Sequence, residues 1–80
     1  MHYVYILQSV KFSDRYYVGQ TDDLKKRLSR HNAGYAKATK PFVPWKIVSY
    51  HAFADVSTAM NFEKYLKSGS GVAFAKKRLR

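Results

Sequence analysis

Two short runs of aromatic and β-branched residues lie close together at the start of this chain, and they constrain its fold more than any other feature. Tyr3 to Gln8 has apolar side chains at both alternating positions, which is typical of a strand buried on both faces. Arg15 to Gly19 is a second such run, and only the polar stretch from Ser9 to Asp14 separates the two. Two strand-like runs joined by a short loop predict an antiparallel hairpin.

A basic helix is expected to follow the hairpin. Thr21 is a suitable N-cap, and two aspartates follow it at the positive end of the helix dipole. Leu24 and Leu28 form the apolar stripe, and Gly34 is suited to a left-handed C-terminal cap. The stretch from Tyr35 to Pro44 is then expected to be a loop.

The second half predicts one strand and two helices. Trp45 to Phe53 is the third strand, and Asp55 or Ser57 begins a helix. Its buried stripe is expected to be Ala59, Phe62 and Leu66. Ser68 to Gly71 is expected to break this helix before a short third one over Val72 to Leu79, whose inward-facing residues would be Val72, Phe74 or Ala75, and Leu79. The order β-β-α-β-α-α predicts one small α+β domain over residues 1–80, with a three-stranded sheet.

Net charge limits the class of partner. Fifteen Lys and Arg against five acidic residues give +10 on 80 residues, which favours a polyanion. Nucleic acid is the first candidate, an anionic membrane surface the second and an acidic protein the third. There is no cysteine, which excludes disulfides and thiolate metal sites and fits a reducing compartment such as the cytoplasm. No signal peptide or membrane-spanning segment is expected.

Glu63 is the only glutamate, and it lies within the second predicted helix. A lone carboxylate beside a sheet can hold Mg²⁺, which accepts one or two carboxylates and completes its octahedron with water and substrate phosphate. The alternative is an ion pair with Lys67, four residues on, which would stabilise the helix by about 0.2–0.5 kcal/mol.

Arg27 and His31 share one face of the first predicted helix, four residues apart. Arginine binds phosphate in a bidentate manner and can stabilise charge on phosphoryl oxygens. Histidine can relay a proton or contact phosphate. The alternatives are one more surface cation and a surface histidine at a helix C-terminus.

Tyr5 and Tyr17 lie on the two strands of the hairpin, and their phenols could meet on one face of the sheet. A phenol beside Arg27 and a metal would ionise more readily and could act as a general base. The alternative is that both are core aromatics with their hydroxyls at the rim. Gly19 either makes room for the backbone or admits a phosphate.

In sequence order, these residues resemble the motifs of the GIY-YIG nuclease superfamily. Tyr3-Val4-Tyr5 matches the first motif with Tyr in place of Gly, and Tyr17-Val18-Gly19 matches the second with Val in place of Ile. Arg27, His31 and Glu63 follow at the family's positions. The chain is most similar to small single-domain bacterial members described as excinuclease-like. The asparagine that larger members carry after the glutamate helix is absent here.

The resemblance implies a three-stranded antiparallel sheet flanked by helices and a one-metal endonuclease. Glu63 would hold Mg²⁺ or Mn²⁺, Tyr5 or Tyr17 would deprotonate water, Arg27 would stabilise the phosphorane-like charge, and His31 would support the site. The expected substrate is branched, nicked or damaged DNA in repair or recombination, with RNA still open. A catalytically idle nucleic-acid-binding module is the alternative.

We expect a monomer or weak homodimer, with a partner protein for targeting. The cationic residues expected to contact nucleic acid are Lys25, Lys26, Arg30, Lys37, Lys40, Lys67, Lys76, Lys77 and Arg78.

Overall fold

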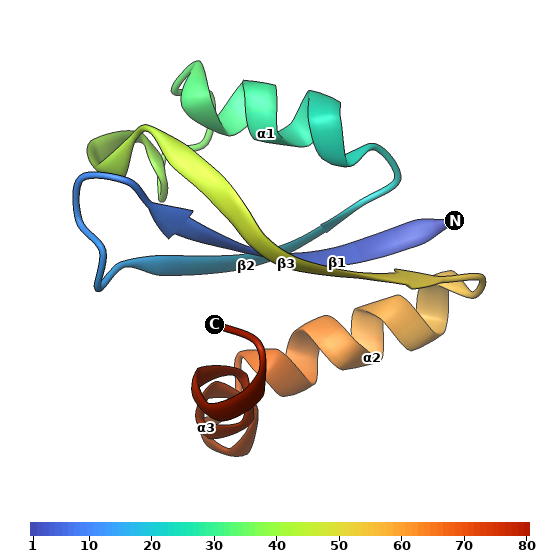
Figure 1. The fold of residues 1–80 in the computed structure, drawn as a ribbon. Coiled ribbons are helices and arrows are strands. Elements are labelled where there is room, and N and C mark those ends of the chain that lie inside the picture. The colour runs from blue at the N-terminus through green and yellow to red at the C-terminus, as the bar shows by residue number, and fades with distance from the viewer.

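A three-stranded antiparallel sheet forms the middle layer of the computed structural model, which describes all 80 residues. Its central strand is β1 (His2–Ser9), with β2 (Tyr16–Thr21) on one side and β3 (Trp45–Phe53) on the other. Figure 1 shows α1 (Leu24–Asn32) on one face of the sheet, and α2 (Val56–Leu66) and α3 (Gly69–Arg78) on the other. The predicted hairpin, element order and α+β class are confirmed.

The continuous apolar run of β1 is explained by burial on both faces. Val4 and Ile6 face α2 and α3, where they pack against Ala59, Leu66 and Ala75. Tyr5 and Leu7 face α1 and pack against Trp45. Complete burial of an aliphatic side chain contributes about 1.5–3 kcal/mol, so this strand organises both halves of the core.

The first helix is capped by Asp23 and not, as predicted, by Thr21. The Asp23 carboxylate accepts a hydrogen bond from the Lys26 backbone N–H at 3.0 Å. Thr21 is buried at the end of β2, and its hydroxyl accepts from the Asp23 backbone N–H at 3.1 Å. It therefore shapes the turn that precedes the helix. Gly34 has φ +84°, which confirms the left-handed position after the helix.

The third helix begins three residues earlier than predicted. Ser68 caps it by accepting the Gly71 backbone N–H at 3.2 Å, so the expected break shrinks to one short turn after α2. Gly71 is buried against the end of α2, where a side chain would collide with the backbone of Tyr65 and Leu66. Val72 is 46% exposed and does not face inward as predicted, whereas Ala75 is buried. Leu79 packs against the core, as expected.

The loop between α1 and β3 contains a single short 3₁₀ turn, η1 (Lys40–Phe42). Thr39, immediately before it, is completely buried.

Asp55 caps α2 by accepting a hydrogen bond from the Ser57 backbone N–H. Asp55 is one of the two residues that were predicted to begin this helix. None of the helices has the length and apolar character needed to cross a membrane.

Candidate functional site

Tyr5 and Tyr17 meet on the face of the sheet that α1 covers. The hairpin register places Tyr5 opposite Gly19, and Tyr17 lies two residues from that glycine, so both side chains point to the same face. Both contact His31 of α1. The Tyr5 Oη lies 2.9 Å from His31 Nε2, and the ring centroids of Tyr17 and His31 are 5.1 Å apart. The hairpin therefore brings the two phenols together around one imidazole.

Gly19 makes room for the Tyr5 ring. A Cβ atom at Gly19 would lie 2.6 Å from Tyr5 Cζ, with Tyr5 Oη closer still, and 3.1 Å from Tyr17 Cε2. Of the two roles considered for this glycine, the geometry supports the structural one. The Tyr5 ring crosses the β2 backbone to reach the helix, and only a residue without a side chain permits this path.

His31 is a buried group and not a surface histidine. Its side chain is 2% exposed, and its second ring nitrogen, Nδ1, lies 2.8 Å from the hydroxyl of Thr39. Burial lowers the pKa of His31 below its ordinary value, and the nearby Arg27 guanidinium lowers it further. The imidazole is therefore neutral at physiological pH and can accept a proton.

The Tyr5 phenol is also held neutral. Burial raises the pKa of Tyr5 to about 12, with smaller contributions from Tyr17 and Glu63, and these outweigh the lowering effect of Arg27. Arg27 lowers the pKa of Tyr5, as expected from the sequence, but without a bound metal the effect of desolvation is larger. The hydrogen bond of this phenol to His31 is a route for proton transfer that needs no free phenolate.

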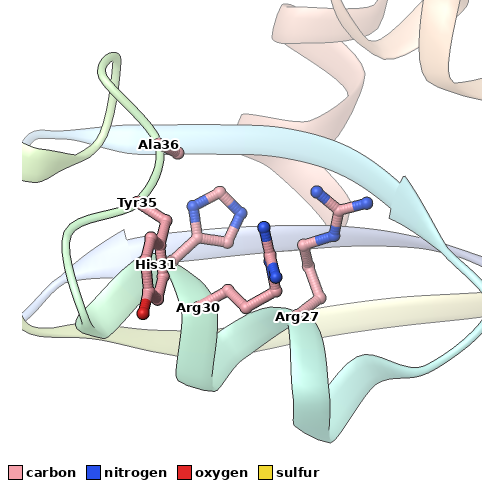
Figure 2. A pocket seen from close by; sticks show the side chains of 5 residues that line it. All are labelled: Arg27, Arg30, His31, Tyr35 and Ala36. Carbon is pink, nitrogen blue, oxygen red and sulfur yellow. The ribbon is translucent and has the colours of Figure 1, made fainter.

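Arg27 is exposed one turn before His31 and has no carboxylate partner, since the only ion pair in the structure joins Lys67 and Glu63. It lines an open pocket of about 200 Å³ together with Arg30, His31, Tyr35 and Ala36. Figure 2 shows that Arg27, Arg30 and His31 project from the same side of α1. A guanidinium without a counter-ion beside such a pocket is available to bind a phosphate.

A second open pocket, of about 260 Å³, continues along α1 and is lined entirely by polar side chains. Arg27 and Arg30 line both pockets. Both guanidiniums therefore border both pockets, although the Arg30 guanidinium lies 5.2 Å from the centroid of the Tyr35 ring and Asp22 and Asp23 also line the second pocket.

Glu63 approaches β2 from the other face of the sheet. One carboxylate oxygen accepts from Gln20 Nε2 at 2.7 Å, and the other pairs with Lys67 Nζ at 3.0 Å. The Lys67 ammonium in turn lies 5.9 Å from the centroid of the Tyr17 ring. The ion pair considered as an alternative role for Glu63 is thus present, and it places Glu63 near the tyrosines at the edge formed by β2.

The donor set fits only a cation that needs few protein ligands. No group of three or more His, Cys, Asp or Glu side chains is present, so a closed protein cage is excluded. Glu63 supplies one carboxylate whose side chain is 18% exposed. Its two oxygens offer about four lone-pair positions, of which Gln20 and Lys67 use two. This suits Mg²⁺ or Mn²⁺ bound mainly by water and phosphate.

The cationic residues predicted to contact nucleic acid are all exposed, but they do not share one surface. Lys25, Lys26 and Arg30 lie on α1, whereas Lys76, Lys77 and Arg78 lie on α3, across the sheet from α1 (Figure 1). The group on α1 is the one beside the pockets of Arg27.

Two residues of the site were not found from the sequence. Gln20 links Glu63 to β2, and Thr39 holds the far nitrogen of His31. The alternation along β2 does place Gln20 on the α2 face, but its polar partner comes from a helix 43 positions away. Nothing in the loop sequence distinguishes Thr39 from an ordinary surface threonine.

The family model described as "GIY-YIG catalytic domain" matches residues 1–76. The chain belongs to this family. Membership places it in a nuclease superfamily and confirms the resemblance seen in the motifs. In this GIY-YIG domain, both motif tyrosines contact the histidine that follows them.

The relatives are small bacterial proteins named UPF0213. One from Streptococcus pneumoniae serotype 4 is 39% identical over 66 residues, covering 81% of this chain and 65% of the relative. One from Streptococcus pyogenes serotype M3 is 41% identical, covering 81% and 70%. One from Lacticaseibacillus paracasei is 39% identical over 67 residues, covering 82% and 73%. The chain spans about two thirds of the pneumococcal protein's length.

Proposed function

We propose that this GIY-YIG domain is a metal-dependent endonuclease that hydrolyses DNA phosphodiesters, directed by DNA structure or damage and not by base sequence. One observation carries the proposal. The β2 edge joins a neutral Tyr5–His31 pair and a free Arg27 on one face to Glu63 on the other. Family membership and the charge of +10 support the same activity.

Glu63 is the residue that would hold Mg²⁺ or Mn²⁺. The bound cation would supply Lewis-acid stabilisation of the phosphoryl and leaving oxygens. Gln20 orients the carboxylate through its hydrogen bond, and Lys67 neutralises it when no other cation is near. A ligand held by its neighbours in this way keeps its geometry during substrate binding.

Tyr5 and His31 would handle the proton of the attacking water. A phenol with a pKa of about 12 is a poor base when it must first ionise. It becomes effective when it passes its own proton to His31 Nε2, 2.9 Å away, while accepting one from water. Tyr17 packs against the same imidazole and limits its movement.

Arg27 would stabilise the negative charge that develops on the phosphoryl oxygens. It has no carboxylate partner to lose when substrate binds, so its full charge faces the phosphate. Arg30, which lines the same pockets, would hold the strand beside the scissile phosphate.

Backbone contacts of this kind carry no base information, which favours selection by DNA structure in repair or recombination. A partner protein is expected to supply targeting.

The test is nicking of supercoiled and branched DNA in Mg²⁺ or Mn²⁺. Glu63→Gln keeps the shape of the side chain and removes its charge, so it should abolish cutting while DNA binding persists. Asp14→Asn is the matched control, because it makes the same chemical change at an exposed position in the β1–β2 turn. Cutting by Glu63→Gln at the wild-type rate would exclude Glu63 as the metal ligand.

The alternative is an idle DNA-binding module, and the engaged Glu63 carboxylate is the observation that favours it. This alternative predicts that the wild-type protein binds DNA but cuts it with neither metal. Binding would be measured by fluorescence anisotropy on the same substrates.

A further inference from the structure

Thr39 is an interior threonine whose hydroxyl has a defined partner on each side. It is completely buried beside η1, and its hydroxyl lies 2.8 Å from His31 Nδ1 and 3.3 Å from the Ala36 carbonyl oxygen. Its own carbonyl oxygen accepts from Trp45 Nε1 at 2.9 Å. The indole of a buried core residue thus fixes the backbone from which this hydroxyl projects.

The hydrogen-bond partners of Thr39 can accommodate a proton on His31 Nδ1. A threonine hydroxyl has one proton to donate, and the Ala36 carbonyl oxygen, which also accepts from the backbone N–H groups of Thr39 and Lys40, is an acceptor for it at 3.3 Å. With that proton directed to Ala36, the same hydroxyl accepts from His31 Nδ1 at 2.8 Å. A neutral imidazole protonated at Nδ1 has a free lone pair at Nε2.

Tyr5 leads independently to the same tautomer. Its phenol is 3% exposed, and the only hydrogen-bond partner of its hydroxyl is His31 Nε2. A buried hydroxyl proton without an acceptor is unfavourable by about 1–3 kcal/mol. If Nε2 carried the proton, the Tyr5 hydroxyl would have to accept it and its own proton would have no partner. With the proton on Nδ1, the Tyr5 hydroxyl donates to His31 Nε2, His31 Nδ1–H donates to the Thr39 hydroxyl, and that hydroxyl donates to the Ala36 carbonyl.

We propose that Thr39 is a positioning residue that holds His31 as the Nδ1–H tautomer, so that Nε2 can take the phenol proton of Tyr5 during DNA cleavage. The reaction part of this inference rests on the proposed nuclease function. Thr39 touches neither substrate nor the attacking water, and it acts only through His31.

The proton transfers balance in this arrangement. The attacking water loses a proton to Tyr5 Oη as its oxygen forms a bond to phosphorus. The original phenol proton moves to His31 Nε2, giving an imidazolium whose Nδ1–H stays on Thr39. The bond from phosphorus to the leaving oxygen breaks, and that oxygen takes a proton from solvent. His31 then returns its extra proton to solvent through Tyr5.

Nuclear magnetic resonance of protein labelled with ¹⁵N at histidine tests the tautomer directly, at a pH where His31 is neutral. The wild type should show a protonated Nδ1 and an unprotonated Nε2 for His31, assigned by the loss of its signals in His31→Gln. Thr39→Val keeps the shape of the side chain and removes the hydroxyl, so the Nδ1–H tautomer should lose its dominance. Thr39→Ser, which retains a hydroxyl, should restore it.

Cleavage provides the second readout. Thr39→Val should lower kcat by about 10²-fold with KM and DNA binding unchanged, and Thr39→Ser should recover most of the loss. An Nε2–H tautomer in the wild type would overturn the proposal. So would wild-type tautomer and kcat in Thr39→Val. If Thr39→Val does not fold, the wild-type and Thr39→Ser spectra still decide the tautomer. If the wild type has the Nδ1–H tautomer but never cuts, the nuclease function fails and the positioning of His31 stands.

Discussion

Replacing Gly19 with alanine should misplace Tyr5. The new Cβ would lie 2.6 Å from Tyr5 Cζ, whereas ordinary contact begins at 3.4 Å, so the ring must retreat by about 0.8 Å. Tyr5 is 3% exposed in a close-packed core, and its hydroxyl is bonded to His31 at 2.9 Å, so it cannot move without losing contacts.

The expected cost follows from two opposing effects. Forcing an extra methyl group into a packed site costs about 1–3 kcal/mol. Alanine in place of glycine recovers about 0.5–1 kcal/mol of backbone entropy. The midpoints of these two ranges leave a net loss of stability of about 1 kcal/mol. Activity should fall further, by about 10²-fold, because a displacement near 1 Å disturbs the alignment of reacting groups.

Urea unfolding followed by fluorescence of Trp45, the single tryptophan, measures the stability, and DNA nicking measures the activity. Gly69→Ala is the matched control, because a Cβ there meets nothing within 4 Å and the position begins a helix. It should keep full activity. Wild-type stability in Gly19→Ala would refute the packing argument, and reduced stability with full activity would refute the role of the Tyr5–His31 contact.

Three further predictions concern other parts of the domain. Gly71→Ala should cost about 3 kcal/mol or more, since the collision is with the backbone of Leu66 at 2.7 Å, and Gly69→Ala in the same unfolding assay should be neutral or stabilising. The free energy of unfolding should fall as the pH is lowered from about 6.5, because burial lowers the pKa of His31 and His51 in the folded protein and the unfolded chain then binds more protons. Urea midpoints at two pH values check this. His51→Gln should reduce the dependence of the free energy of unfolding on pH. Lys67→Met should increase the affinity for Mn²⁺ by about two- to fivefold, because it removes the ammonium group that pairs with the Glu63 carboxylate. Calorimetry measures this affinity, and an unchanged value would argue against Glu63 as the ligand.

The three strands and the β1–β2 hairpin could be predicted from the sequence, because the signal for each lies within a strand or in the short loop that joins the first two strands. The double-faced burial of Tyr3 to Gln8 is visible as an uninterrupted apolar run, and Trp45–Phe53 matches the predicted third strand at both ends. Gly34 signalled its left-handed position in the same way. In each case the sequence signal lies within the element itself, although the residues that bury β1 come from distant helices and from β3.

The start of α3 was missed although its cap is local, because Ser68 bonds to Gly71 only three residues on and a stretch rich in serine and glycine was interpreted as a break. The other parts that were missed depend on contacts between distant residues. The raised pKa of Tyr5 depends on burial by a helix 26 positions away. Thr39 acquires its role only when the loop folds beneath Trp45. Charge and residue type in the sequence therefore indicated which residues belong to the site, but not the effect of burial on their pKa values.

Because β2 lies at the edge of the sheet, the arrangement of the site depends on the register of a single strand pair. This strand pairs with β1 alone, through a ladder from Tyr3–Thr21 to Gln8–Tyr16. A slip by one residue would send Tyr17 to the side of α2 and Gln20 to the side of α1, exchanging the two halves of the site. A slip by two would keep the faces but move Tyr17 about 7 Å along the strand. Insertions in the β1–β2 turn are thus compatible with this chemistry only if they bulge outward and leave the pairing unchanged.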